Sequence, residues 1–253
     1  MTADNFHQNK KITYRDLLWD TAFFGLSCLK VILHEPLSIS EWAEVENRIK
    51  SYDFVTIENQ HSEPENARLI GQKTSAFLAD TNIQFQKQVK FVNELHPSIR
   101  ICNPMERDDR LLDIGDFRYS RFFEDKQLAS RGGKEVYKQW LLNAFNKEDK
   151  YFAVSEHNNL PCGYVLFSFT ENVCIIELIA VSEQFSGQGI GAALFNAVEF
   201  EACRKGAGII QVGTQVRNLR AINFYHKMGC KHVGSHQIYH LHQVKRKGME
   251  DKA

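Results

Sequence analysis

The chain has 253 residues, which is enough for one large domain or two small ones. Its hydrophobic content of 43% and charged content of 25% are typical of an ordinary globular protein. The formal net charge at pH 7 is +0, so the chain lacks the basic excess of a non-specific nucleic-acid binder.

Targeting and redox features indicate a cytoplasmic protein. No apolar stretch reaches the length of a membrane span, and residues 1–11 lack the apolar core of a secretory signal. The cysteines are scattered without a C-x-x-C pair, and most lie in apolar runs, where we expect small buried side chains with free thiols. They are Cys28, Cys102, Cys162, Cys174, Cys203 and Cys230.

The first 95 residues alternate between helical and strand-like patterns, which predicts a small N-terminal α/β domain over residues 1–95. Residues 12–33 end in a strand-like run, and residues 53–59 are a second strand. Residues 38–51 are a helix with Ser40 as its candidate N-cap. Residues 67–89 are a short helix, a turn and then a strand. No repeat long enough for a solenoid is present.

The remaining residues, 96–253, are predicted to form a second α/β domain. In chain order we expect a strand at 99–101, a helix at 106–114 and a long polar and aromatic segment at 116–134. A helix at 135–145 and three strands at 151–156, 162–170 and 173–181 follow, the first two strands joined as a hairpin. A helix at 190–205, a strand at 208–216, a helix at 218–228, a strand pair within 230–244 and a fraying tail at 246–253 complete the chain.

A glycine-rich loop separates the strand at 173–181 from the helix that follows. Gly187, Gly189 and Gly191 have the spacing G-x-G-x-G. Glycines let a backbone approach a ligand closely, and the free amides at a helix N-terminus favour phosphate. The spacing matches neither a Walker loop nor the dinucleotide fingerprint. From the loop alone, a tight turn without a ligand remains open.

A second motif lies downstream, in residues 218–230, NLRAINFYHKMGC. Together, this motif and the loop SGQGIGAAL resemble the GNAT superfamily of acetyl-CoA-dependent N-acetyltransferases, over about the last 155 residues. The resemblance implies a mixed, mostly antiparallel sheet flanked by helices, with acetyl-CoA as co-substrate and no metal. One departure is Ser186, which stands where the family's loop usually opens with Arg or Gln.

The resemblance also implies which residues bind acetyl-CoA. They lie on the strand before the loop, in the loop, and on the helix of the second motif. They are Ile179, Val181, Gly187, Gln188, Gly189, Ile190, Gly191, Ala192, Asn218, Ala221 and Phe224.

A looser resemblance concerns the acceptor. Residues 19–25, WDTAFFG, and then residues 117–122 and 137–145 are similar to the bacterial dTDP-fucosamine acetyltransferase group. That group acetylates the amine of a dideoxy-amino sugar carried on dTDP, which implies lipopolysaccharide-type biosynthesis and an acceptor site shared with the N-terminal domain. Guanidinium groups could pair with a sugar-nucleotide pyrophosphate, and aromatic rings could stack on a base or sugar. The candidates are Phe24, Phe117, Arg118, Tyr119 and Arg121; Phe24 could equally be plain core, and residues 116–134 a solvated loop.

Acetyl transfer needs a proton donor for the thiolate leaving group and a way to deprotonate the amine. In the family motif a tyrosine at the position of Tyr225 stands beside the CoA sulfur, so Tyr225 is the candidate acid. For the base, three alternatives stay open. Glu177 interrupts an apolar strand, where a carboxylate must be paired, functional or at an edge. Asp80 precedes the last strand of the first domain. Solvent is the third.

Histidines are frequent near the C-terminus, but no pair with a third ligand has metal-binding spacing, so no metal is expected. The leading function is N-acetylation of a dTDP-linked 3- or 4-amino sugar. The alternatives are a protein, polyamine or antibiotic amine as acceptor, or a CoA-binding module without catalysis. The expected partner is the nucleotide-sugar substrate, and a homodimer is the possible assembly. Binding to nucleic acid or to a membrane is not expected.

Overall fold

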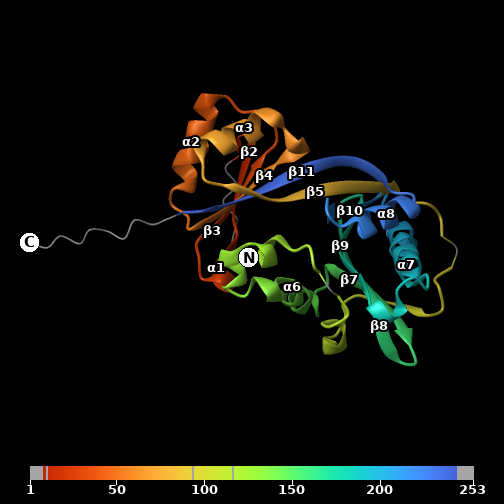
Figure 1. Ribbon diagram of the computed structural model, residues 1–253. Helices are drawn as coiled ribbons and strands as arrows, with labels where there is room; N and C mark the ends of the chain where they lie inside the picture. The colour runs from red at the N-terminus through yellow and green to blue at the C-terminus, as the bar shows by residue number, and fades with distance from the viewer. Residues whose placement is uncertain (1–7, 10, 93, 116, 244–253) are drawn as a thin grey trace, which may run out of the picture. The chain divides into compact units, whose positions relative to one another are not determined.

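The computed structural model describes residues 8–9, 11–92, 94–115 and 117–243 (Figure 1). Within them the chain forms two compact units. Of the described residues, the first contains those from 8 to 82, 121 to 133 and 235 to 243, and the second contains those from 83 to 120 and 134 to 234. Two of the boundaries between the units fall inside strands, at residues 77–88 and 231–242, and each unit is built from separate segments of the chain. The sequence suggested one boundary between residues 95 and 96. That each predicted domain folds by itself stays a prediction, and the predicted tail lies outside the described residues.

The first unit is a sheet with helices packed on it. Its elements are β1 (Gln8–Asn9), β2 (Ile12–Asp16), α1 (Leu18–Phe24), β3 (Cys28–Leu33), α2 (Ile39–Ile49), β4 (Phe54–Asn59), η1 (Gln60–Ser62), α3 (Pro64–Lys73), α4 (Arg121–Glu124) and α5 (Lys126–Ala129), with parts of β5 (Phe77–Gln88) and β11 (Lys231–His242). The strand order is β1-β2-β3-β4-β11-β5, and β3 and β4 are parallel. One apolar cluster joins α2 and α3 to the sheet through Trp42, Val45, Ile49, Leu69 and Ile70.

The second unit carries the motifs found in the sequence. Its elements are β6 (Ile99–Cys102), η2 (Asp109–Leu111), η3 (Gly133–Glu135), α6 (Val136–Ala144), β7 (Lys150–His157), β8 (Leu160–Thr170), β9 (Val173–Val181), η4 (Glu183–Phe185), α7 (Ile190–Arg204), β10 (Ile209–Gln215) and α8 (Leu219–Lys227). The strand order is β5-β10-β9-β8-β7-β6, antiparallel from β6 to β9 and parallel between β9 and β10. This confirms the predicted mixed, mostly antiparallel sheet.

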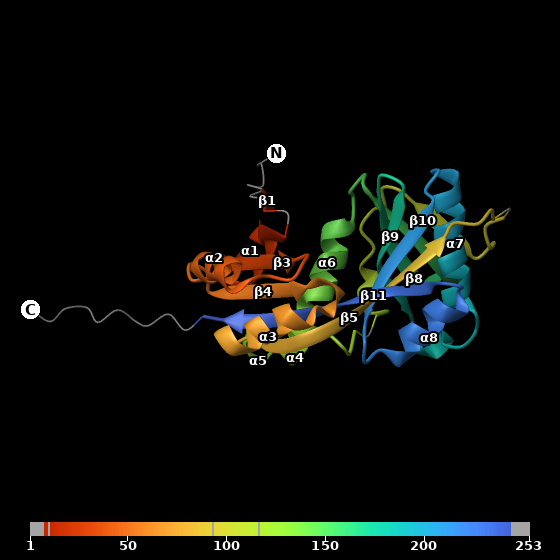
Figure 2. The same cartoon turned by 90° about the horizontal axis from the view of Figure 1, so that it is seen from above.

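Alternating side chains of β7 and β8 build a core on each face of this sheet. Ala153 and Val165 pack with α7, and Phe152 and Leu166 pack with α6. Seen from above, α7 lies beside β9 and β10 (Figure 2). β9 contributes to both cores, because Ile176 belongs to one and Leu178 to the other.

Three local predictions were wrong, and one open alternative is decided. The N-cap of α2 is Ser38 rather than Ser40, because Ser38 and Glu41 form a reciprocal capping box. Residues 106–114 contain only the 3₁₀ turn η2, which Asp108 caps. The solvated loop that stayed open for residues 116–134 is not what forms, since α4 and α5 lie between residues 121 and 129. Residues 231–242 are one continuous strand, β11, rather than a strand pair.

A buried carboxylate holds α5 to β11 within the first unit. One oxygen of Asp125, Oδ1, caps α5, and the other, Oδ2, lies 2.8 Å from His240 Nδ1 and 2.7 Å from His242 Nε2. Burial lowers the pKa of His240 to about 4, so its ring is neutral at pH 7. The hydrogen bonds from the two histidines lower the pKa of Asp125 against the effect of its burial. The contact explains why residues 121–133 belong to the first unit.

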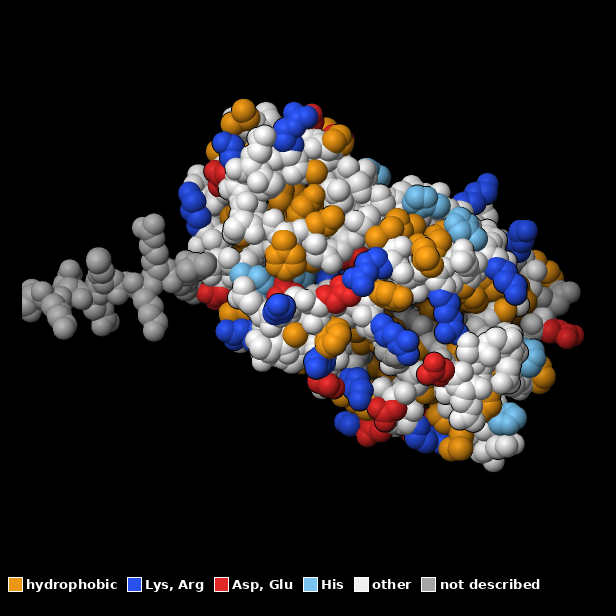
Figure 3. Space-filling view, in the orientation of Figure 1, with side chains coloured by type: hydrophobic (Ala, Val, Ile, Leu, Met, Phe, Trp, Pro, Cys, Tyr) orange, Lys and Arg blue, Asp and Glu red, His pale blue; other side chains and the backbone are white. Residues whose placement is uncertain are grey.

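The surface matches the neutral composition. On the face drawn in Figure 3, Lys and Arg side chains are interspersed with Asp and Glu. Among the described residues, no helix is long and apolar enough to cross a membrane. All six cysteines are free thiols, and Cys28, Cys162, Cys174 and Cys230 are buried as expected.

Candidate functional site

The glycine loop has the backbone geometry of an anion site. Gly187 and Gly189 have φ values of 81° and 84°, which side chains rarely adopt, and a Cβ on either would meet no atom within 4 Å. Gly189 is the N-cap residue of α7, where no side chain caps the helix and no acidic residue lies in the first turn. The first amides of α7, at Ile190, Gly191 and Ala192, therefore begin the helix beside open space and can receive an anion.

Gly191 has a different role from the two glycines before it. A Cβ there would lie 3.3 Å from the ring of Phe224 on α8, so the glycine lets the two helices approach. The ring of Phe224 also packs edge-on against Phe195 of α7, with centroids 6.2 Å apart. The loop and the second sequence motif thus meet in the structure, as their pairing in the sequence suggested.

The parallel pairing of β9 and β10 ends before β9 itself does. The ladder runs from Val173 and Ile209 to Ile176 and Val212 and goes no further, although β9 continues to Val181. Opposite β8 the register skips Glu177, which makes this residue a β-bulge. The half-buried candidates Ile179 and Val181 therefore lie on the stretch of β9 beyond the ladder. An extended ligand could use the backbone groups of that stretch.

The N-terminus of α8 brings polar groups to the loop. Asn218 caps this helix by accepting a hydrogen bond from the amide of Ala221. Arg220, in the first turn, donates to the hydroxyl of Ser186. The exposed Gln188 contacts the carbonyl of Gln184 within the loop. Sequence reasoning missed Arg220, which supplies a guanidinium next to Ser186, where an arginine of the loop itself is absent.

Tyr225 is enclosed on α8. Its side chain is only 3% exposed, and its ring lies 5.5 Å from that of Phe85 and 5.4 Å from that of Phe224. Burial raises the pKa of Tyr225 above its ordinary value. The phenol is therefore protonated at neutral pH, which is the form that a proton donor requires.

Glu177 has an ion-pair partner and two further hydrogen-bond donors. Pairing was one of the alternatives expected for a carboxylate in an apolar strand. Its Oε1 accepts from Lys150 Nζ at 2.6 Å and from Ser168 Oγ at 2.5 Å. Its Oε2 accepts from Trp140 Nε1 at 3.2 Å. The three donors come from α6, β7 and β8, so the carboxylate links the helix to the sheet.

The other acceptor candidates divide between the two units. Asp80 lies on β5 in the first unit, and its Oδ2 is buried. Phe24 is 3% exposed and packs on Phe122, as a core side chain would. Arg121 begins α4 with its guanidinium carbon 4.4 Å from the Phe122 ring centre.

The remaining three acceptor candidates lie in the second unit. Phe117 stacks on Tyr137 with ring centroids 4.5 Å apart. Arg118 is exposed. Tyr119 is partly exposed, and the guanidinium carbon of Arg217 lies 5.6 Å from the centre of its ring. The residues from 117 to 121 therefore do not gather as one group within a single unit.

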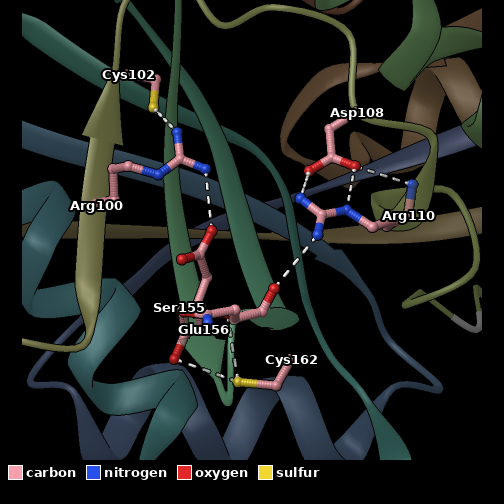
Figure 4. A network of polar contacts seen from close by, with 8 residues as sticks. Arg100, Cys102, Asp108, Arg110, Ser155, Glu156 and Cys162 are labelled. Atoms are coloured by element: carbon pink, nitrogen blue, oxygen red, sulfur yellow. Dashed lines mark hydrogen bonds and ion pairs between the residues drawn. The ribbon is translucent and has the colours of Figure 1, made fainter.

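A polar network fixes the chain that leads to Phe117 (Figure 4). Arg100 on β6 donates to Glu156 on β7 at 3.1 Å and to the sulfur of Cys102 at 2.6 Å. Asp108 and Arg110 form a two-pronged pair at 2.8 Å, and Arg110 also donates to the carbonyl of Asn159 in the β7–β8 turn. These contacts anchor residues 100–110 to the edge of the sheet.

In the described part of the chain, no group of three or more His, Cys, Asp or Glu side chains is arranged to hold a metal ion. Asp125, His240 and His242 are joined by hydrogen bonds instead. His240 Nδ1 and His242 Nε2 both contact Asp125 Oδ2, so these nitrogens are occupied by the carboxylate.

Comparison with known proteins relates residues 114–230 to a known family. The model of the acetyltransferase (GNAT) family matches residues 114–230. A GCN5-related N-acetyltransferase from Sphaerobacter thermophilus aligns with a TM-score of 0.58 and 13% identity, covering 92% of this chain and 76% of that one. The family match and the structural likeness confirm the predicted fold class.

Two curated proteins are similar in sequence. The spore coat polysaccharide biosynthesis protein SpsD of Bacillus subtilis is 24% identical over 243 residues, which is 91% of this chain and 83% of that protein. The uncharacterized N-acetyltransferase MJ1207 of Methanocaldococcus jannaschii is 32% identical over 121 residues, 45% of this chain and 52% of that protein.

Proposed function

From the match of residues 114–230 to the acetyltransferase (GNAT) family, we propose that this chain transfers acetyl from acetyl-CoA to the amine of a dTDP-linked amino-dideoxy sugar. The observation that supports a sugar as the acceptor is the similarity to SpsD. This similarity spans both units rather than residues 114–230 alone. That protein is named for polysaccharide biosynthesis, and a nucleotide-linked sugar is a suitable precursor for such a product.

The loop geometry supports binding of acetyl-CoA. The diphosphate would lie on the amides from Gly187 to Ala192, and the guanidinium of Arg220 would add a positive charge. The extended pantetheine arm would follow β9 beyond the end of its ladder with β10. Asn218, Ala221 and Phe224 would form the other wall, on α8.

The chemistry requires three events. The neutral amine attacks the thioester carbonyl and its nitrogen then loses a proton to a base, the tetrahedral oxyanion is stabilised by hydrogen-bond donors, and the C–S bond breaks as the thiolate receives a proton. Tyr225 is the donor of that proton in this proposal. Burial raises the pKa of the Tyr225 phenol above its ordinary value, so the phenol keeps its proton at neutral pH until the thiolate forms beside it.

A panel of acceptors tests the function. With acetyl-CoA present, free thiol release is measured for dTDP-linked 3-amino and 4-amino sugars, for spermidine and for a peptide with a free N-terminus. We expect thiol release with a nucleotide-linked amino sugar. Release with only spermidine or the peptide would assign a different acceptor. A thermal shift with acetyl-CoA but no release on any amine would identify a binding module.

The pH profile of kcat/KM separates the three candidate routes for the amine's proton. We expect Glu177→Gln to lower kcat/KM by about 100-fold or more and to remove the acidic limb, because an amide cannot take a proton. Asp80→Asn should keep the acidic limb. Loss of the limb in the Asp80 variant alone would reverse the assignment, and two profiles like that of the wild type would leave solvent as the base.

A further inference from the structure

Glu177 has one acceptor position left after its three hydrogen bonds. A carboxylate offers about four lone-pair sites, two on each oxygen. Oε1 uses both of its sites, for Lys150 and Ser168, whereas Oε2 accepts only from Trp140. The free site on Oε2 can therefore accept one more N–H or O–H donor, next to the indole ring of Trp140.

An aromatic ladder leads to that position. Phe117 stacks on Tyr137, and Tyr137 stacks on Trp140 with ring centroids 6.2 Å apart and planes 10° from parallel. Tyr137 and Trp140 are three residues apart on α6, so they share a face of the helix. The ladder ends in the open, because Trp140 is 39% exposed.

The inner end of the ladder is fixed by close packing. A Cβ on Gly115 would lie 2.5 Å from the Phe117 ring and 3.3 Å from Cβ of Ala180 on β9. Only glycine at position 115 lets the ring of Phe117 lie at this place beside β9. The ladder is thus held at one end and offers a flat apolar face at the other.

The charges around Glu177 favour a neutral donor. The Lys150 ammonium, at 2.6 Å, already balances the carboxylate. A second ammonium placed beside Lys150 would meet a like charge, which favours loss of its proton. The position therefore suits an uncharged amine or hydroxyl, and the amine that attacks a thioester must be uncharged.

We propose that the exposed face of Trp140 and the free lone pair of Glu177 Oε2 form the acceptor subsite, which binds a sugar ring through its C–H face and its amine through an N–H bond. This subsite rests on the proposed function. An indole face provides a large rigid apolar surface with a polar group at its edge, which matches the mixed surface of a sugar. Trp140 also positions Glu177 through its own N–H.

The test uses the full chain with dTDP-4-amino-4,6-dideoxyglucose as acceptor and compares three variants. Trp140→Leu removes both the ring and the N–H, and Trp140→Phe keeps a ring without the N–H. Phe91→Leu is the control, since Phe91 is also an exposed aromatic side chain, at 80%, and lies outside every set of candidate site residues. The KM of each substrate, kcat, thermal stability and tryptophan fluorescence are measured.

We expect Trp140→Leu to raise the acceptor KM roughly tenfold, as the loss of a stacking face of this size implies. Trp140→Phe should raise it less, and the KM of acetyl-CoA should stay unchanged in both. The acceptor should quench the fluorescence of the wild type and not that of Trp140→Phe. Combining Trp140→Leu with Glu177→Gln should give less than the product of the two single effects, by more than a factor of about two.

Three results would overturn the subsite. They are an unchanged acceptor KM in both Trp140 variants, an equal rise in the KM of acetyl-CoA, and the same loss in the Phe91 control. If Trp140→Leu does not fold, Trp140→Phe and the quenching experiment decide. Absence of wild-type turnover with the sugar would instead refute the proposed function, so the two failures are distinguishable.

Discussion

Replacing Tyr225 with phenylalanine is expected to lower kcat by about 100-fold or more while the Kd of acetyl-CoA changes by less than about twofold. General acid catalysis contributes roughly 10²–10⁴ to rate, and a phenyl ring has no proton to give to the leaving thiolate. The ring contacts with Phe85 and Phe224 remain in the variant, so the packing that encloses this side chain is preserved.

Steady-state turnover with one acceptor measures kcat, and calorimetric titration with acetyl-CoA measures its Kd. The matched control is Tyr164→Phe, because Tyr164 is also buried, with its pKa raised by burial, but it lies in the core on the α6 face of the sheet. We expect the control to keep its kcat. A Tyr225→Phe enzyme with the kcat of the wild type would remove Tyr225 from the reaction.

The elements that the sequence predicted well are those with local signals. β7, β8 and β9 are long apolar strands, and the two positive φ angles between β7 and β8 fall on Asn158 and Asn159, residues that tolerate this backbone conformation. The glycine spacing before α7 was equally informative, because positive φ at Gly187 and Gly189 is a property of the local chain.

The wrong predictions have particular physical causes. Ser38 and Ser40 both precede an apolar run, but only Ser38 has Glu41 three residues later, which completes the capping box. The segment 106–114 has one fully buried apolar side chain, Leu111, which is too little to support a helix. The strand pair predicted within 230–244 is one strand, because Gly234 has no positive φ and β11 continues through it.

The site depended on contacts that no local pattern encodes. Glu177 was identified as a carboxylate that needs a partner, but its donors Lys150, Ser168 and Trp140 come from three other elements. Arg220 reaches Ser186 across 34 positions of the chain. The residue types were visible in the sequence, whereas their pairing follows from how α6 and α8 pack against the sheet.

Replacing Gly189 with alanine is expected to weaken acetyl-CoA binding roughly tenfold or more. The residue has a φ of 84° at the start of α7, and its added Cβ would point into open space beside the first helical amides. If that space receives the diphosphate, the Cβ prevents its close approach and lengthens at least one charge-assisted hydrogen bond, worth about 1.5–3 kcal/mol.

The strain of alanine at positive φ must be separated from this loss of binding. Gly206→Ala provides the separation, because Gly206 has a φ of 76°, its Cβ would also meet nothing within 4 Å, and it lies beyond the other end of α7. Each variant should lose about 1–2 kcal/mol of unfolding free energy to backbone strain. Only Gly189→Ala should bind acetyl-CoA more weakly in a calorimetric titration. If both variants bind acetyl-CoA with equal affinity, backbone strain explains the whole effect of Gly189→Ala. The amides at the start of α7 would then not hold the diphosphate.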